Sequence, residues 1–492
     1  MDYLLALDAG TTSNRAIVFS ADGQAVGQHQ ILLPQHYPAD GWVEHDAADI
    51  LSGLIESGRM AIQAAGLRAD QIAGVGLTNQ RETTLVWDKA TGQTIYPAIV
   101  WQDRRTANWC AQAKDQGHEA MVQSKTGLLL DPYFSATKAA WILDNVEGAR
   151  ARAEVGELAF GTVDSFVAWH LSGGRSHIIE ATNAARTLLF NIDTQAWDTE
   201  LLALFNVPAN LLPQVVDSAG DLADIDASIW GAPMVLSGIA GDQHAALIGQ
   251  AGIQPGMLKS TYGTGCFMIA NTGVERRVSN QRLLSTLAYR LNGQPTYALE
   301  GAIFNVGTAI QWLRDNLKLF NDAAQTQAMA QEAKSDDGVY LVPAFTGLGA
   351  PWWDPHARGL LCGLTRDTGP NEMVRAALEA AAYQTADLTQ AMEADGQRVS
   401  RIRVDGGMVV NDWFCQALAD ITGACIDRPQ VTETTALGAA LLAGLGVGVF
   451  DSLEQACQSW QLDQSFERVM PAQQAADKQA GWLRAIARAT TH

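Results

Sequence analysis

The sequence predicts an α/β protein built from two related halves. Residues 3–31 and 259–269 share one pattern, an apolar strand that ends in a Gly/Thr turn and continues as a second strand. Helical patterns follow both stretches, and strands that alternate with helices are typical of layered α/β folds. The chain of 492 residues also exceeds one ordinary domain, since domains usually contain about 100–200 residues. We therefore expect two domains, residues 1–250 and 251–492, with the ligand between them.

The first half opens with a predicted antiparallel meander. Its first strand ends at Asp8, and Asp22-Gly23 separates the second strand from the third. An Asp-Gly pair between two short extended runs is a hairpin signal. The expected elements of this half are strands at 3–7, 16–19, 25–31, 72–77 and 85–87 and a helix near 47–66.

The second half repeats the strand, turn and strand before its helices begin. Residues 401–404 form a later expected strand, which ends in Asp405 and two glycines. No Pro- or Ser-rich linker separates the halves, which favours two closely packed domains. The expected elements are a strand–turn–strand unit at 259–269, strands at 296–299 and 401–404, and helices at 305–315, 411–422 and near 434–445.

Composition limits the class of protein and its partners. Hydrophobic residues make up 47% of the chain and charged residues 17%, which excludes a disordered or fibrous protein. The net charge of −20 argues against nucleic-acid or anionic-membrane binding, because both need a basic surface. Six cysteines without a Cys-x-x-Cys pattern favour reduced thiols. With no signal-peptide pattern and no long apolar stretch, we expect a cytoplasmic protein without membrane insertion.

Residues 8–15, Asp-Ala-Gly-Thr-Thr-Ser-Asn-Arg, predict a phosphate-binding hairpin. Backbone N–H groups and hydroxyl side chains of such a loop can hold phosphate oxygens, and Asp8 can approach Mg²⁺ directly or through water. The loop lacks the Gly-x-x-x-x-Gly-Lys-Ser/Thr pattern of a P-loop. A turn that only closes a hairpin is the alternative. A second loop at 261–265 aligns with residues 8–12 and favours phosphate binding, because two such hairpins would face one ligand.

Two further strand ends carry glycines. Residues 236–244 place Asp242 at the tip of an expected strand, and 404–407 end in paired glycines. Glycine lets the backbone approach a flat or anionic ligand closely. Four loops of this kind are therefore expected around one site.

Four such loops resemble the nucleotide site of the actin, hexokinase and Hsp70 superfamily. Within it, the chain resembles the FGGY carbohydrate kinases over essentially its whole length, and most closely the glycerol kinases among them. The resemblance implies two ribonuclease H-like (actin-like ATPase) domains with a nucleotide and substrate cleft between them. The segments that carry it are 41–45, 78–83, 99–105, 131–135, 238–243, 261–267 and 342–351, with the family's two signatures at 133–142 and 359–379.

The resemblance implies the ATP-dependent phosphorylation of glycerol to sn-glycerol 3-phosphate. Asp242 would be the general base that takes the proton of the attacking hydroxyl, and Mg²⁺ at Asp8 would offset the phosphate charge. A homodimer or homotetramer is also implied. The implied glycerol contacts are Arg81, Glu82, Trp101, Tyr133, Asp242, Gln243 and Phe267. The implied nucleotide contacts are Thr11, Thr12, Ser13, Arg15, Thr264, Gly307, Gln311, Gly407 and Asn411.

Other interpretations stay open at this point. A related kinase of a pentulose, erythritol or dihydroxyacetone would share the phosphate loops but differ at 78–83 and 131–135. A non-catalytic, nucleotide-gated clamp is a second alternative, although it would not need both Asp8 and Asp242. Glu82 could form a surface ion pair with Arg81, and His244 is expected to pack or to support the site rather than to act as the base.

Three regulatory features of some relatives are missing from the sequence. Those relatives bind the inhibitor fructose 1,6-bisphosphate through a Gly-Gly-Lys-Gly-Gly loop, and the corresponding residues 223–231 contain two acids and no lysine. Others carry a phosphorylatable histidine in this region, but no histidine lies between 178 and 243. Residues 471–480 also lack the acidic patch with which enteric relatives dock a sugar-transport protein. We therefore expect none of these three controls.

Overall fold

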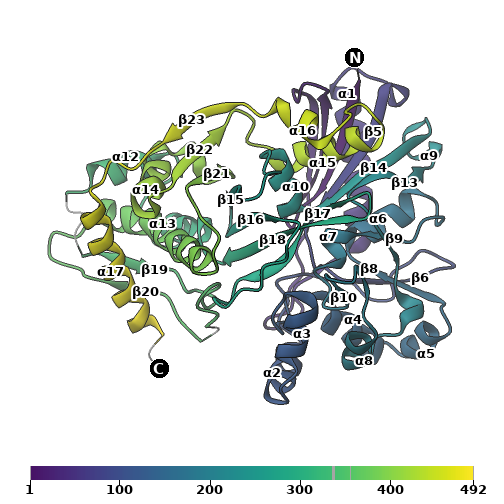
Figure 1. Ribbon diagram of the computed structural model, residues 1–492, viewed down its shortest axis with the longest axis horizontal. Coiled ribbons are helices and arrows are strands. Elements are labelled where there is room, and N and C mark those ends of the chain that lie inside the picture. The colour runs from purple at the N-terminus through teal and green to yellow at the C-terminus, as the bar shows by residue number, and fades with distance from the viewer. Residues whose placement is uncertain (1, 335–337, 355, 491–492) are drawn as a thin grey trace.

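The computed structural model describes residues 2–334, 338–354 and 356–490, which form two halves that each surround a β-sheet (Figure 1). The first sheet has the order β13-β14-β5-β1-β2-β3 and the second β17-β18-β16-β15-β21-β22-β23. The first sheet consists of β1 (Tyr3–Ala9), β2 (Ser13–Ser20), β3 (Ala25–Leu32), β5 (Ile72–Asn79), β13 (Ala219–Ile225) and β14 (Met234–Gly241). The second consists of β15 (Leu258–Tyr262), β16 (Cys266–Gly273), β17 (Leu284–Leu291), β18 (Gln294–Ile303), β21 (Arg401–Asp405), β22 (Cys425–Pro429) and β23 (Leu462–Phe466).

Helices and short strand pairs cover these two sheets. The helices before residue 250 are α1 (Ala47–Ala64), α2 (Ala107–Asp115), α3 (Glu119–Thr126), α4 (Ser135–Asn145), α5 (Ala149–Glu154), α6 (Val163–Leu171), α7 (Ala181–Ala184), α8 (Thr199–Phe205), α9 (Ala227–Trp230) and α10 (Asp242–Gly249). Later helices are α11 (Gly307–Asp315), α12 (Gln325–Glu332), α13 (Pro370–Ala394), α14 (Asp412–Thr422), α15 (Thr434–Gly446), α16 (Leu453–Ala456) and α17 (Ala472–Ala489). The short strands are β4 (Glu44–His45), β6 (Leu85–Asp88), β7 (Ala98–Ile99), β8 (Leu158–Gly161), β9 (Ile178–Glu180), β10 (Phe190–Asn191), β11 (Ala196–Trp197), β12 (Gln214–Val216), β19 (Tyr340–Val342) and β20 (Leu360–Cys362).

The two sheets repeat one topology. In the first, β1 pairs antiparallel with β2 and parallel with β5, which pairs parallel with β14. In the second, β15 pairs antiparallel with β16 and parallel with β21, which pairs parallel with β22. Asp8 lies beside Thr78 in this register and Thr261 beside Asp405, so the two hairpin turns occupy equivalent strand ends. The predicted α/β fold with two related halves is confirmed.

One late helix packs against the first sheet. Helix α15 lies beside the N-terminal strands in Figure 1, and its residues share a buried cluster with Leu4, Ala6 and Ile17. The approach is close, since a Cβ atom at Gly76 would lie 2.1 Å from the carbonyl oxygen of Ala439. Small residues in α15 and the sheet therefore hold the halves together. Helix α15 comes from the later part of the chain but packs on the sheet of the earlier part. The division into two domains at residue 250 therefore stays a prediction.

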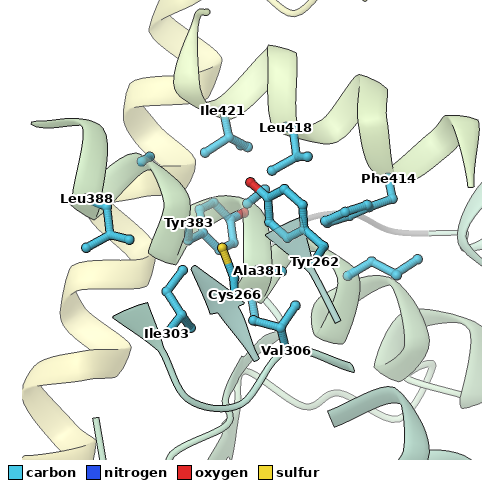
Figure 2. Packing of buried hydrophobic residues seen from close by; sticks show 14 of the residues in the cluster. Tyr262, Cys266, Ile303, Val306, Ala381, Tyr383, Leu388, Phe414, Leu418 and Ile421 are labelled. Atoms are coloured by element: carbon cyan, nitrogen blue, oxygen red, sulfur yellow. The ribbon is translucent and has the colours of Figure 1, made fainter. Parts of the chain in front are cut away.

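The core of the second half lies between its sheet and helices α13 and α14 (Figure 2). Tyr262 packs edge-on against Phe414 at a centroid distance of 5.1 Å, and its hydroxyl lies 2.9 Å from Thr385 Oγ1. A buried tyrosine needs such a partner, because an unpaired hydroxyl in an apolar core is costly. This packing anchors the strand that leads into the second Gly/Thr turn. No helix among the described residues combines the length and the apolar character that crossing a membrane requires.

Candidate active site

Three parallel strand ends of the first sheet meet at one edge and carry the main polar residues. Asp8 is the next-to-last residue of β1, Arg81 follows β5, and Asp242 follows β14. In the register, Asp8 pairs with Thr78 and Gly241 with Asn79. The carboxyl ends of neighbouring parallel strands are where α/β proteins bind ligands. The sheet therefore places the predicted base, the predicted glycerol arginine and the predicted metal ligand along one edge.

Arg81 is buried and forms a two-point ion pair. Its Nη1 atom lies 2.6 Å from Glu300 Oε2 and its Nη2 atom 2.9 Å from Glu300 Oε1. Its Nε atom lies 3.2 Å from Asp242 Oδ1. A Cβ atom at Gly241 would lie 2.7 Å from Arg81 Cγ, so only glycine leaves room for the arginine stem. The guanidinium is thus fixed beside the predicted base.

Glu82 is buried too, and its charge pairs with a different arginine. Arg186 Nε lies 2.6 Å from Glu82 Oε1, whereas Arg81 Nε is 3.9 Å from the same oxygen. The backbone of Glu82 is left-handed, with φ 61°, which is uncommon for a residue with a side chain. The alternative of a surface ion pair between Arg81 and Glu82 is therefore wrong. Sequence adjacency suggested that pair, but folding directs the carboxylate to Arg186.

Three aromatic side chains border these charges. Trp101 packs edge-on against Tyr133 at 5.6 Å and against Phe267 at 6.1 Å between ring centroids. Arg81 Nη2 lies 3.5 Å from the Tyr133 hydroxyl. Trp101 Nε1 donates to Thr11 Oγ1 over 2.9 Å, which ties this aromatic group to the first Gly/Thr turn. The structure therefore brings the predicted aromatic wall and the predicted polar contacts together.

Asp242 is the first residue of α10, and its partly exposed carboxylate lies near the cations Arg81 and Lys259. About a third of its side chain, 32%, is exposed, and Oδ1 accepts from the backbone N–H of Gln243 over 2.7 Å. Loss of hydration raises the pKa of Asp242 above its ordinary value, while Arg81 and Lys259 oppose that rise. A carboxylate whose pKa lies above its ordinary value suits a general base, because it binds the transferred proton more readily.

Lys259 fixes the amide of Gln243 from the other sheet. This buried lysine of β15 donates to Gln243 Oε1 over 2.5 Å and to Thr261 Oγ1 over 2.5 Å. Burial lowers its pKa, although Asp405 and Asp242 favour its charge. Because the amide oxygen is occupied, the amide nitrogen of Gln243 is left to donate to a ligand.

His244 is completely buried behind these residues. Neither ring nitrogen has a hydrogen-bond partner within residues 2–334, 338–354 and 356–490. Burial and the positive charge of Arg81 place the pKa of His244 well below its ordinary value. A neutral, packed imidazole fits the expectation that His244 supports the site.

The first Gly/Thr turn is a tight loop between β1 and β2. The backbone N–H of Gly10 donates to the carbonyl of Ser13 over 3.0 Å, and Thr11, Thr12 and Ser13 follow one another around it. Arg15 is engaged with two acids, since its Nη2 lies 3.0 Å from Asp8 Oδ2 and its Nη1 2.5 Å from Glu433 Oε2. These contacts use two of the five N–H groups of the guanidinium, so Arg15 keeps further donors for a phosphate.

The predicted nucleotide residues of the second half follow three different strands, β15, β18 and β21. Thr264 lies in the second turn, and the N–H of Gly307 donates to the carbonyl of Gly263 over 3.0 Å. Gln311 is exposed on α11. Gly407 is exposed after β21, and Asn411 caps α14 by accepting from Phe414 N over 3.0 Å. The second turn is joined to the start of α11, because the N–H groups of Val306 and Thr308 donate to the carbonyl of Thr264. Among the described residues, no hydrogen bond links Gln311 to Asn411.

The acids at the strand ends fit a shared magnesium site. Asp8 and Asp242 are close enough for the charge of Asp8 to raise the pKa of Asp242. No group of three or more His, Cys, Asp or Glu side chains with metal-binding geometry occurs among the described residues. Mg²⁺ is commonly held by one or two carboxylates together with substrate phosphates. The residues present therefore fit a magnesium ion that arrives with a nucleotide.

Sequence reasoning missed three charged contributors to this site, namely Lys259, Glu300 and Arg186. Glu300 stands in an apolar stretch of β18 and Arg186 in a segment without a recognised motif, whereas Lys259 opens the strand–turn–strand unit at 259–269 but was given no role. The available signal for Glu300 was a charged residue directly after the predicted strand at 296–299, in an apolar stretch. A buried charged residue needs a partner of opposite charge. For Glu300, the predicted glycerol residue Arg81 was a cation without an assigned partner.

Comparison with known proteins connects this geometry to a family. The chain matches the model of the FGGY family of carbohydrate kinases, N-terminal domain, over residues 3–249 and C-terminal domain over residues 258–447. It is 59% identical over 489 residues to a glycerol kinase of Alcanivorax borkumensis, covering 99% of this chain and 98% of that protein. It is 58% identical to glycerol kinase 1 of Pseudomonas aeruginosa, with 99% and 98% covered.

Solved structures share the fold. A Plasmodium falciparum glycerol kinase with ADP superposes with a TM-score of 0.93 at 32% identity, covering 100% of this chain and 99% of that one. A ligand-bound xylulose kinase of Lactobacillus acidophilus reaches a TM-score of 0.87 at 21% identity, with 99% and 97% covered. The second likeness concerns the fold alone.

Proposed function

The chain belongs to the FGGY family of carbohydrate kinases, and from that premise we propose that it transfers the γ-phosphoryl group of ATP to a terminal hydroxyl of glycerol. The product would be sn-glycerol 3-phosphate. The observation that carries the proposal is identity above half of all positions with curated glycerol kinases across nearly the full chain. The polar and aromatic groups at the strand ends supply the chemistry that such a substrate needs.

Glycerol would lie between the charged and the aromatic residues. Its three hydroxyls need several donors and acceptors in fixed positions, and the Arg81 guanidinium, the Asp242 carboxylate and the Gln243 amide provide them. Trp101 and Phe267 would cover the carbon chain, since aromatic faces accept C–H groups and exclude water. Tyr133 and Glu82 would be further glycerol contacts, and the bond from Arg186 to Oε1 holds the carboxylate of Glu82 in place.

Asp242 would accept the proton of the reacting hydroxyl at its carboxylate. The glycerol oxygen then forms a bond to the γ-phosphorus as the bond between that phosphorus and the ADP oxygen breaks. Since the proton leaves as the new bond forms, the base must be ionised and must lie within hydrogen-bond reach of the hydroxyl. The N–H of Gln243 on Oδ1 leaves the other carboxylate oxygen for this role.

The two Gly/Thr turns would hold the phosphates from opposite sheets. Thr11, Thr12 and Ser13 belong to the first turn and Thr264 to the second. Mg²⁺ at Asp8 would supply charge neutralisation of the phosphates. We further propose two domains divided near residue 250 that close around both substrates, which would exclude water from the reaction, and a homodimer or homotetramer as the assembled form.

Coupled measurement of ADP release tests the proposed function. With Mg-ATP, glycerol is expected to stimulate ADP release strongly, and xylulose, ribulose and erythritol are expected to have little effect. Added EDTA should abolish the glycerol-dependent rate. Stimulation by another polyol alone would replace glycerol as the substrate and remove Arg81, Glu82 and Tyr133 as glycerol determinants. No stimulation by any polyol would favour a nucleotide-gated clamp.

Fructose 1,6-bisphosphate is expected to leave this activity unchanged at millimolar concentration. Residues 223–231 cover the end of β13 and helix α9, where Asp226 caps the helix by accepting from Ser228 N over 3.0 Å. With Asp224 nearby and no lysine, this segment would repel a bisphosphate. Steady-state rates with and without the sugar bisphosphate check the prediction. Tight inhibition that disappears after changes at 223–231 would contradict it.

A further inference from the structure

We propose that Glu300 is a positioning residue for glycerol binding, which acts from the second sheet by holding Arg81 in its substrate-binding orientation. This inference rests on the proposed function, because it assigns Arg81 to the substrate. Glu300 belongs to β18, whereas Arg81 follows β5. The pair therefore joins the two sheets at the predicted glycerol site.

The geometry of the pair fixes the guanidinium plane. Both oxygens of Glu300 accept from Arg81, at 2.6 Å and 2.9 Å, and neither side chain is more than 2% exposed. A two-point contact between a carboxylate and a guanidinium sets direction as well as distance. With Nη1 and Nη2 held, Nε is left facing Asp242 at 3.2 Å. The orientation of Arg81 toward the reacting end is thus set by Glu300.

The surrounding charges make Glu300 necessary for this arrangement. Arg186 also contacts Glu300, with Nη2 3.1 Å from Oε1, and Glu82 is bonded to the same arginine. Burial opposes ionisation of Glu300, but Arg186 and Arg81 outweigh it and lower its pKa to about 2. Two arginines and two glutamates therefore form a buried, balanced group. Without the charge of Glu300, only Glu82 would offset the charges of Arg81 and Arg186 within this group.

Glu300→Gln tests the proposal because it keeps the size of the side chain and removes its charge. We expect the KM for glycerol to rise about 10- to 100-fold, in line with the loss of a charged hydrogen bond, and the KM for ATP to stay near the wild-type value. A wild-type KM for glycerol would overturn the proposal. An equal loss of affinity for both substrates would also overturn it, since it would indicate a general structural defect.

Two further variants keep the test decisive if the glutamine variant folds poorly. Glu300→Asp retains the charge but is shorter, so it cannot keep both contacts and should give an intermediate KM for glycerol. Glu44→Gln is the matched control, because it removes a buried carboxylate from Arg105, whose partners include no predicted site residue. It should leave the KM for glycerol unchanged. A wild-type KM in Glu300→Asp, or the same rise in Glu44→Gln, would contradict the proposal.

A double-mutant cycle shows whether Glu300 acts through Arg81. If it does, Arg81→Met and the double variant Arg81→Met with Glu300→Met should have the same KM for glycerol. Replacing both members of a buried ion pair by apolar side chains is often tolerated by the fold. Multiplying effects would overturn the proposal. Failure of the proposed function is distinguishable, because the wild-type protein would then not phosphorylate glycerol at all.

Discussion

Asp242→Asn is expected to lower the turnover of glycerol by about 10²- to 10⁴-fold, the usual contribution of a general base. Asparagine keeps the shape of the side chain and can still bond a hydroxyl, but it cannot take up the proton. Glycerol binding should therefore change little. Steady-state kcat and direct glycerol titration by calorimetry separate the two effects. A variant with near-wild-type turnover would remove Asp242 from the role of base.

Asp217→Asn is the matched control for this loss. Asp217 also pairs with an arginine, Arg290 Nε at 2.5 Å, and 22% of its side chain is exposed, close to the exposure of Asp242. It lies between β12 and β13, and its carboxylate bonds to Arg290 and to the N–H of Gly293 rather than to a predicted site residue. Turnover should stay near the wild-type value in this variant. The comparison shows whether losing a carboxylate beside an arginine is by itself enough to slow the enzyme.

The elements that could be predicted from the sequence are those with strong local patterns, and helices such as α13 and α17 were not among them. Apolar runs and Gly/Thr turns located the strands, and the expected helices are present within two residues of the predicted ends. Several strands extend beyond the apolar runs, as β1 does through Asp8 to Ala9. Their ends are polar because they form the site, where hydrophobic patterning no longer applies.

The partners of the site residues could not be predicted, because they depend on contacts between distant segments. Glu300 and Arg81 are 219 positions apart, and the sequence around either one contains no sign of the other. The alternative for Glu82 was an ion pair with its neighbour Arg81, but its backbone is left-handed and its carboxylate bonds to Arg186. The packing of α15 on the first sheet also depends on a contact between segments that are distant in the sequence. Local patterns indicate which residues are charged, and the fold decides which charges meet.

Arg81→Ala is expected to raise the KM for glycerol by about 100-fold or more, since a charged hydrogen bond and its positioning are both lost. It should also shift the pH dependence of the reaction. Arg81 lowers the pKa of Asp242, so its removal raises that pKa. Because the base must be deprotonated, the acidic limb of the kcat/KM profile should move to higher pH. A pH series of initial rates at several glycerol concentrations measures both effects.

Arg105→Ala serves as the control for Arg81→Ala, because Arg105 is an equally buried arginine with two acidic partners, Glu44 and Asp103. Removing either arginine deprives buried carboxylates of a cationic partner and should lower thermal stability. Only the change at Arg81 should raise the KM for glycerol and displace the acidic limb. Since the loss of stability is common to both variants, the kinetic difference between them isolates the role of Arg81. An unchanged KM in Arg81→Ala would exclude it from the substrate site, and with it the proposed reason for the contact with Glu300.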